Sequence, residues 1–393
     1  MYIPYYITIL ILFLMMITIN TDDIIVIKMY AIPQTLIYCL LGDYTYKPLL
    51  IDTESDITII PENRAHILKN PKQLSEITVT YKQHQVKTLE FIDTWNIICP
   101  YNNLQLLNDF HLLMANEDLP FFVGYSSFGF AHSFQHEKYS LVHKFYKDKL
   151  IKNKIFSLWK NKTVFQDTFL ILGKVPFNYT KYDNSSLQMQ KFIIPVKPKS
   201  IYWETQLNAF TITNNETKQF YYKNQYPVLF SVKYKGIYVP KDIYTYIKDI
   251  YFGDLFKDYK CVSGTNYIEC GCYHIKNLGN ITLIFNNIEI TIQPSDIFTE
   301  NEEFECTFIL YENSHTQMDN KYWIIGVTDF LWENTISFNY ESNQIEIYSS
   351  NLNGRFRNIN SIHFTMRINI YIFIIILLIL CVIFLLYIKR NNK

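Results

Sequence analysis

Short runs of apolar, β-branched and aromatic residues alternate with polar turns over most of the chain. Four of these runs are typical of strands: Ile77–Tyr81, Phe169–Leu172, Ile281–Phe285 and Ile288–Ile292. Helical spacing is confined to short patches, of which the clearest cover Ser140–Leu150 and Lys241–Tyr251. Many strands with few helices predict a mostly β protein with one or two cores.

Two longer apolar segments lie at the ends of the chain. Residues 368–388 contain no charge and are long enough to cross a hydrocarbon core of about 30 Å. Basic residues flank this segment, with Arg367 before it and Lys389 and Arg390 after it. The positive-inside rule therefore predicts a transmembrane helix with residues 389–393 in the cytosol, so that the helix contacts membrane lipid.

The N-terminal apolar run, Ile7–Ile19, is shorter and favours a signal peptide within residues 1–21. No Lys or Arg precedes the run and no clear small-residue cleavage site follows it, so an uncleaved signal anchor remains open. If the signal peptide is cleaved, we expect a single-pass membrane protein. In both cases the ectodomain would lie in the lumen of the secretory pathway or outside the cell.

Charge and composition exclude two classes of protein. The 393 residues carry 36 basic and 36 acidic side chains, whereas an electrostatic nucleic-acid binder has a basic excess. With 18% charged and 17% aromatic residues, the chain is also too apolar for wholesale disorder. We therefore expect a folded protein with no nucleic-acid partner.

The cysteines agree with an oxidising compartment. Outside the predicted membrane helix there are six: Cys39, Cys99, Cys261, Cys270, Cys272 and Cys306. Cys270 and Cys272 lie near His274 but lack the spacing of a zinc site, so disulfides are favoured and no metal is predicted. Five sequons predict a glycoprotein: Asn161, Asn178, Asn184, Asn215 and Asn280.

Candidate chemistry lies in residues 49–61, LLIDTESDITIIP, where an apolar strand leads into Asp52-Thr53-x-Ser55 and a second strand ends at Pro61. This segment resembles the first active-site loop of the pepsin-like aspartic peptidases. Further matches follow in the family's order along the chain: the hairpin 77–95 with Tyr81, the loop 122–129, the stretches 150–158 and 169–176, Tyr202-Trp203, and the closing segment 323–347. The resemblance covers residues 37–347.

The resemblance implies a bilobal, mostly β fold with a peptide-binding cleft between the lobes and a C-terminal transmembrane helix. We expect an N-terminal lobe over residues 37–196, a C-terminal lobe over 202–349 and a stalk over 351–366. By the same resemblance, Asp52 is the retained catalytic residue, while Tyr81, Thr53 and Ser55 bind substrate. The family's chemistry needs no cofactor.

The chain departs from the family at both active-site loops. In the stretch that resembles the second loop, 227–240, Ser231 stands where the second aspartate belongs, and Val232 and Lys233 replace the following Thr and Gly. In the first loop Glu54 replaces Gly. The family's reaction requires two carboxylates that share one proton, and a serine hydroxyl cannot hold that proton.

These departures predict a membrane-anchored homologue with impaired catalysis, which binds a peptide or protein ligand in its cleft. The alternative is an active aspartic endopeptidase that cleaves polypeptides in a secretory or acidic compartment. Glu54 could supply a second carboxylate, but from the same lobe as Asp52. If Glu54 points to solvent, Asp52 should titrate alone, whereas an inward Glu54 should couple to it.

The resemblance also implies a disulfide between Cys270 and Cys306. We extend this prediction to a companion bridge between Cys261 and Cys272, because these two cysteines flank the hairpin-like residues 262–269. For Cys39 and Cys99 the sequence leaves both a bridge and free thiols open.

Overall fold

The computed structural model describes residues 25–358, apart from 33, 42–44, 64–67, 69–70, 82–83, 100–102, 116–125, 133–135, 161–167, 176–188, 214–218, 223–224, 259, 265–267, 276–277, 301–304, 316–319, 328–333 and 350–354. The predicted segments 1–21, 368–388 and 389–393 lie outside the described residues, as do four of the five sequons. Within the described ranges, no helix combines the length and the apolar character needed to cross a membrane.

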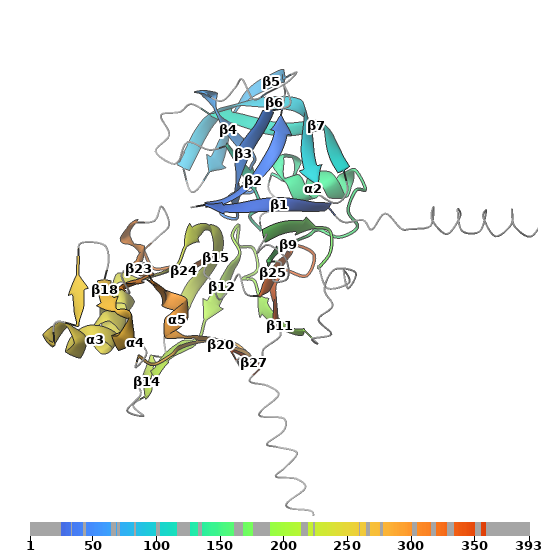
Figure 1. Cartoon of the computed structure of the whole chain (residues 1–393). Helices are drawn as coiled ribbons and strands as arrows, with labels where there is room; N and C mark the ends of the chain where they lie inside the picture. Colours follow the sequence, from blue (N-terminus) through green and yellow to red (C-terminus); the bar gives the residue numbers. More distant parts are fainter. Residues whose placement is uncertain are drawn as a thin grey trace, which may run out of the picture.

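Strands dominate both halves of the chain, as predicted (Figure 1). The first half contains β1 (Ile25–Ile32), β2 (Gln34–Leu41), β3 (Thr45–Asp52), β4 (Ile59–Pro61), β5 (Lys72–Tyr81), β6 (His84–Cys99), β7 (Asn103–Ala115), β8 (Ser126–Gly129), β9 (Ile155–Lys160), β10 (Thr168–Leu172) and β11 (Gln190–Pro195). Its helices are the 3-10 turn η2 (Glu137–Tyr139) and α2 (Leu141–Lys147).

The second half contains β12 (Glu204–Leu207), β13 (Ala209–Thr213), β14 (Gln219–Tyr222), β15 (Tyr226–Lys235), β16 (Ile237–Val239), β17 (Cys261–Ser263), β18 (Ile268–Gly271), β19 (Ile281–Phe285), β20 (Ile288–Ile292), β21 (Phe298–Glu300), β22 (Glu305–Phe308), β23 (Leu310–Glu312), β24 (Trp323–Val327), β25 (Thr335–Asn339), β26 (Gln344–Ser349) and β27 (Phe356–Asn358). Its helices are α3 (Lys241–Lys257), α4 (Cys272–Ile275), α5 (Pro294–Ile297) and the 3-10 turn η4 (Asn313–His315). Strands β19 and β20 coincide with two of the predicted runs. Helix α3 is longer than predicted, because Ile243, Ile247 and Tyr251 form a buried face that continues into Phe252.

The two halves repeat one pattern of four strands. The order is β3-β8-β4-β7 in the first half and β15-β24-β16-β23 in the second. In each half the first pair is parallel, the second antiparallel and the third parallel. The repeat places β3 and β15 in equivalent positions, so the residues at their ends are structural counterparts.

A glycine lies beside the end of each of these equivalent strands. Gly129 in β8 pairs with Asp52, and Gly326 in β24 follows Ile325, which pairs with Phe230. A Cβ atom on Gly129 would lie 2.2 Å from the Ile57 nitrogen, and one on Gly326 would lie 2.4 Å from the Tyr234 oxygen. Each loop therefore packs directly on a backbone that has room for glycine alone.

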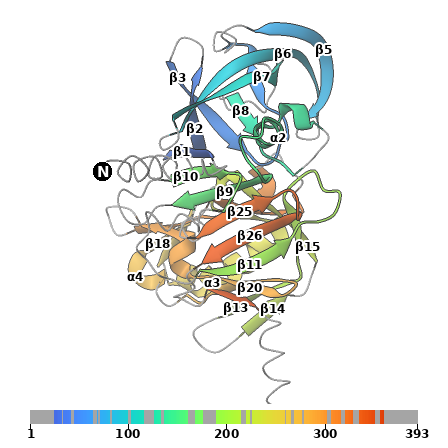
Figure 2. The ribbon, with the colours of Figure 1, turned by 90° about the vertical axis from the view of Figure 1, so that its right-hand side faces the viewer.

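Six strands from both halves form one continuous part of the largest sheet, in the order β11-β26-β25-β9-β10-β1. Figure 2 shows β9, β25, β26 and β11 as neighbours in this sheet. Beside it, Trp203 and Tyr340 both donate a hydrogen bond to the Phe130 oxygen, at 2.7 and 2.9 Å. The backbone nitrogen of Phe130 in turn donates a hydrogen bond to the backbone carbonyl oxygen of Asp52 at 2.7 Å. This bond connects the end of β3 to the junction of the two halves.

The structure moves three of the predicted boundaries. β1 pairs with β2 and β10, so the first lobe begins well before residue 37. β25 and β26, expected in the second lobe, pair with β9 and β11 of the first. The predicted stalk 351–366 includes β27, which pairs with β20 and buries Phe356, while Arg355 pairs with Asp296 at 2.7 Å. Residues 355–358 are therefore part of the folded second half.

The four predicted disulfide cysteines are bonded, but their predicted pairing is wrong. The bridges are Cys261–Cys270 and Cys272–Cys306. Cys270 has Cys261 opposite it on β17 and Cys306 opposite it on β22, so the sheet offers it two partners. It bonds to Cys261 in the hairpin, while Cys272 at the start of α4 reaches Cys306 with a Cα–Cα distance of 5.0 Å. The side chains of Cys39 and Cys99 lie outside the described part.

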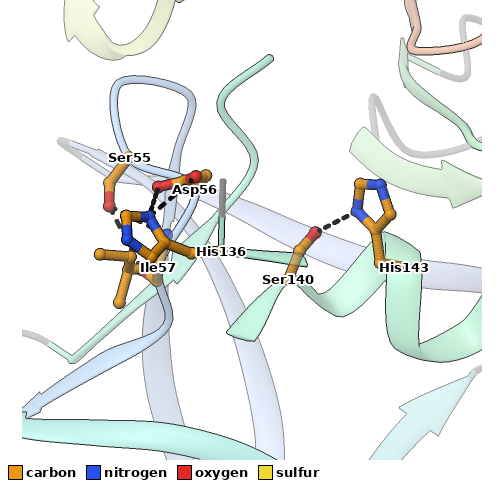
Figure 3. A network of polar contacts seen from close by, with 6 residues as sticks. All are labelled: Ser55, Asp56, Ile57, His136, Ser140 and His143. Carbon is orange, nitrogen blue, oxygen red and sulfur yellow. Dashed lines mark hydrogen bonds and ion pairs between the residues drawn. The ribbon is translucent and has the colours of Figure 1, made fainter. Parts of the chain in front are cut away.

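A set of polar contacts supports the loop that follows Asp52 (Figure 3). The ring of His136 contacts the Asp56 carboxylate at 3.2 Å, and the buried His143 contacts the Ser140 hydroxyl at 3.1 Å. Burial, with a smaller contribution from the Lys154 ammonium, lowers the pKa of His143 to about 4, against the opposing effects of Glu137 and Asp56. The fold therefore holds this imidazole neutral.

This burial predicts a loss of stability in acid. The pKa of His143 is lower in the folded chain than its ordinary value of about 6.5, so the unfolded chain binds more protons and stability falls as the pH drops from about 6.5 to 4. Between about pH 6.5 and pH 4, we expect the free energy of unfolding of His143→Gln to fall by about 2 kcal/mol less than that of the wild type. Urea unfolding at a series of pH values measures this difference. An unchanged slope in the variant would contradict the assignment.

The observed pairing can be checked by peptide mapping. Proteolysis without reduction, followed by mass spectrometry, should recover Cys261–Cys270 and Cys272–Cys306 as linked peptides.

The two bridges also predict different effects on the free energy of unfolding. The bridges close loops with sequence separations of 9 and 34. Replacing Cys272 and Cys306 together by alanine should therefore cost about 1 kcal/mol more than replacing Cys261 and Cys270, as measured by denaturant unfolding of the two matched variants. Recovery of a Cys270–Cys306 peptide would refute the observed pairing.

Candidate functional site

Asp52 ends β3 at the centre of the first half and is completely buried. Apolar neighbours hold the strand in the core, since Leu49 and Ile51 are also fully buried. One carboxylate oxygen, Oδ1, accepts a hydrogen bond from the Glu54 nitrogen at 2.9 Å. The turn that follows Asp52 thus fixes the orientation of its side chain.

Tyr81 covers the other side of this carboxylate. It is the last residue of β5, in the hairpin with β6, and only 3% of it is exposed. Its hydroxyl donates a hydrogen bond to Asp52 Oδ2 at 3.1 Å. Both carboxylate oxygens of Asp52 therefore accept a hydrogen bond from the protein.

Ser231 is the counterpart of Asp52 in the repeated strand pattern. It follows Phe230 in β15, it is buried, and its place beside Gly326 matches that of Asp52 beside Gly129. Its hydroxyl oxygen lies 3.4 Å from the Lys233 nitrogen, the same two-residue spacing as the contact between Glu54 and Asp52. The sequence had placed Ser231 in this position, and the strand order supports that placement independently of any family.

The two loops contact each other directly. The Val232 nitrogen donates to Thr53 Oγ1 at 3.1 Å, and the Ser231 hydroxyl donates to Glu54 Oε1 at 2.8 Å. Lys233 Nζ lies 3.9 Å from Glu54 Oε2, and both side chains are more than 90% buried. Each half contributes to this contact, so it joins the halves next to Asp52.

Glu54 and Lys233 are the residues whose roles the sequence did not reveal. The sequence left open whether Glu54 points to solvent or inward; in the structure it points inward and crosses to the second loop. Lys233 pairs with it from the opposite side. A signal was present, because both residues replace glycines of the resembling family, and two opposite charges at facing glycine positions are suited to an ion pair.

Thr53 and Ser55, two of the three residues that the resemblance predicts to bind substrate, contact the protein itself. Thr53 accepts the hydrogen bond from Val232, as described above. The Ser55 oxygen accepts a hydrogen bond from the Ile57 nitrogen at 3.1 Å, within its own turn. Both contacts shape the loop. Within the described part of the chain, no group of three or more His, Cys, Asp or Glu side chains is arranged to hold a metal ion.

The arrangement has a definite chemical character. It combines two carboxylates, from Asp52 and Glu54, with one ammonium group from Lys233 and with the hydroxyls of Tyr81 and Ser231. The glutamate is paired with a cation and a hydroxyl donor, and the aspartate with a phenol and an amide. Such a centre offers charged hydrogen-bond acceptors, buried between two halves that meet around it.

Comparison with known proteins relates this geometry to a family. The sequence model of the eukaryotic aspartyl protease matches residues 122–349, more than half of the chain, and this match includes Ser231 but not Asp52. No curated protein matches the sequence significantly.

Solved structures show the same fold. Basic 7S globulin from soybean superposes with a TM-score of 0.65 at 12% identity, over 84% of this chain and 98% of the other. The aspartic proteinase from Irpex lacteus gives a TM-score of 0.61 at 12% identity, over 83% of this chain and 97% of the other. Pepsin-like folds of this kind bind peptide substrates in a cleft. The family match and the shared fold agree, and the chain therefore belongs to the eukaryotic aspartyl protease family.

Proposed function

We propose that this chain is a membrane-anchored aspartyl protease homologue that binds an extended peptide or protein segment between its halves without cleaving it efficiently. The observation that carries the proposal is the contact between Ser231 and Glu54 at the place where a second catalytic aspartate would face Asp52. The neighbouring Lys233 and Val232 support the same conclusion, since neither repeats the Thr and Gly of the first-loop pattern.

The chemistry of the family explains why this contact matters. Two carboxylates must share one proton, so that one activates water while the other polarises the peptide carbonyl. Here the second carboxylate is that of Glu54, and an ammonium group 3.9 Å away stabilises it as an anion. Ser231 and Tyr81 donate hydrogen bonds, but a hydroxyl does not replace a carboxylic acid as the proton donor. Peptide binding needs none of these proton transfers.

A second candidate function is that of an active endopeptidase, and one observation favours it. Because Glu54 turns inward, the centre contains two carboxylates, as the reaction requires. The pair would come from one loop, with Ser231 serving as a hydrogen-bond donor to Glu54. This candidate and the first make opposite predictions about cleavage and about acid-dependent inhibitor binding.

Membrane anchoring rests on the uncharged segment 368–388 and its flanking basic residues. Strand β27 ends at Asn358, which leaves the short stretch 359–367 before this segment. An extended residue spans at most about 3.6 Å, so this connection reaches about 30 Å. In the proposed arrangement the second half of the protein lies next to the membrane, in a lumenal or extracellular compartment.

Photo-crosslinking tests peptide binding and cleavage together. We expect decapeptides with a central photoreactive residue to label the β5–β6 hairpin of the full chain in detergent, and mass spectrometry to recover them intact from pH 3 to 7. Asp52→Ala is the control, and its product profile should equal that of the wild type.

Ser231→Asp should not generate efficient cleavage, because Glu54, Val232 and Lys233 still shape the site and catalytic groups need positioning to about 0.5 Å. Cleavage that Asp52→Ala abolishes would contradict the proposal.

Binding of a statine-type transition-state analogue distinguishes the two candidates. Such an analogue relies on a shared proton, so we expect weak binding at every pH in calorimetric titrations of the full chain. The affinity of Glu54→Gln for the analogue should stay within about threefold of the wild-type affinity. The matched change at an exposed position, Glu62→Gln, should have the same small effect. Tight binding that strengthens in acid and disappears in Glu54→Gln would instead establish Asp52 and Glu54 as the catalytic pair.

A further inference from the structure

A cavity of about 530 Å³ lies between the end of β11 and elements of the second half, among residues that the central site does not use. Its walls come from the end of β11 with the segment after it, from β12, from the start of β15, from the turn between β19 and β20, and from the residues just before β24. This volume falls within the range of about 300–1,000 Å³ that is typical of ligand sites.

Three of the lining residues are charged, and two of these are lysines. Glu204 is buried and accepts hydrogen bonds from Lys197 Nζ at 2.8 Å and from the Ser200 hydroxyl at 2.9 Å. Lys197 is thereby held at the wall, although 62% of its side chain is exposed. Lys321 lies at the same cavity, with its ammonium 5.6 Å from the centre of the Tyr322 ring. The cavity thus carries a net positive charge.

Apolar rings and side-chain amides also line the cavity and restrict which ligands it can bind. Pro195, Pro198 and Pro227 line the cavity together with Tyr322, and their rings offer flat apolar surface. Gln206 and Gln225 line the wall as a hydrogen-bonded pair at 2.9 Å. Apolar rings beside side-chain amides suit an extended peptide, whose backbone forms hydrogen bonds while its side chains pack.

We propose that this cavity is a second peptide-binding site, and that it takes an acidic segment of a partner protein. A carboxylate of the segment would bind between Lys321 and Lys197, while neighbouring residues pack on the three prolines and Tyr322. Charge complementarity selects the occupant, because a cavity lined by two lysines and one glutamate attracts an anion. Glu204 acts as a positioning residue that holds Lys197 in place.

The site is distinct from the centre around Asp52 but shares strands with it. β15 contributes Pro227 to the cavity and Ser231 to the centre, four residues further on, which corresponds to about 13 Å along a strand. Lys321 and Tyr322 directly precede β24, whose Gly326 packs on the loop after Ser231. The proposal does not depend on whether the centre binds or cleaves peptides, so the two can fail separately.

Fluorescence anisotropy of the full chain in detergent tests the proposal. The probe is a fluorescein-labelled heptapeptide that alternates proline and glutamate, and its control has glutamine in place of each glutamate. We expect the acidic probe to bind at least tenfold more tightly than its control, and Lys321→Glu to remove this preference. Lys321→Arg should retain it. Lys257→Glu makes the same charge change at an exposed position of α3 outside the cavity and should have no effect.

Each other outcome overturns the proposal. Equal affinity for the two heptapeptides would remove the role of the carboxylates. Equal losses in Lys321→Glu and Lys257→Glu would show non-specific attraction by surface charge. Displacement by inorganic phosphate, but not by chloride at the same ionic strength, would show a site for small anions instead of a peptide. Displacement by the statine-type analogue would place the probe at the centre around Asp52.

Discussion

The contact between the loops that follow β3 and β15 is the constraint on which this structure depends. Two residues from each half meet there in a buried region: Thr53 accepts a hydrogen bond from Val232, and Glu54 accepts one from Ser231. Both loops lie on glycine backbones with no room for a side chain, at Gly129 and Gly326. Because these hydrogen bonds are buried and join one half to the other, they hold the two loops together, and Asp52 lies where they join.

The repeated strand order explains why these two loops lie together. Two halves built to one pattern bring equivalent strand ends together, so a residue in one half faces its counterpart in the other. In a family whose reaction uses two facing carboxylates, this symmetry is the source of the catalytic pair. In this chain Asp52 faces Ser231, and an ion pair between Glu54 and Lys233 occupies the space beside them. A fold that supports peptidases therefore carries a centre in which the Glu54 carboxylate is paired with Lys233 within the protein.

Several features followed from the residues in order along the chain. The strands over 281–285 and 288–292 and the mostly β fold follow from periodicity, which is a local property, and the position of Ser231 follows from the resemblance to the family's second active-site loop. The disulfide pairing did not follow, because Cys270 lies between two cysteines on neighbouring strands, and spacing does not tell which of them it bonds. The end of the second half was also misplaced, since β27 is a short strand that exists through its pairing with β20.

The sequence by itself determined most of the secondary-structure class, the order of the segments that resemble the family and the identity of the residues at the two loops. These depend on neighbours within a few positions along the chain. The tertiary structure decided what those residues do: that Glu54 reaches Ser231, that Lys233 pairs with Glu54, and that Tyr81 covers Asp52. Each of these contacts joins residues at least 29 positions apart. Their partners are set by how β3, β5 and β15 pack against one another, and no local pattern of hydrophobic and polar residues contains that information.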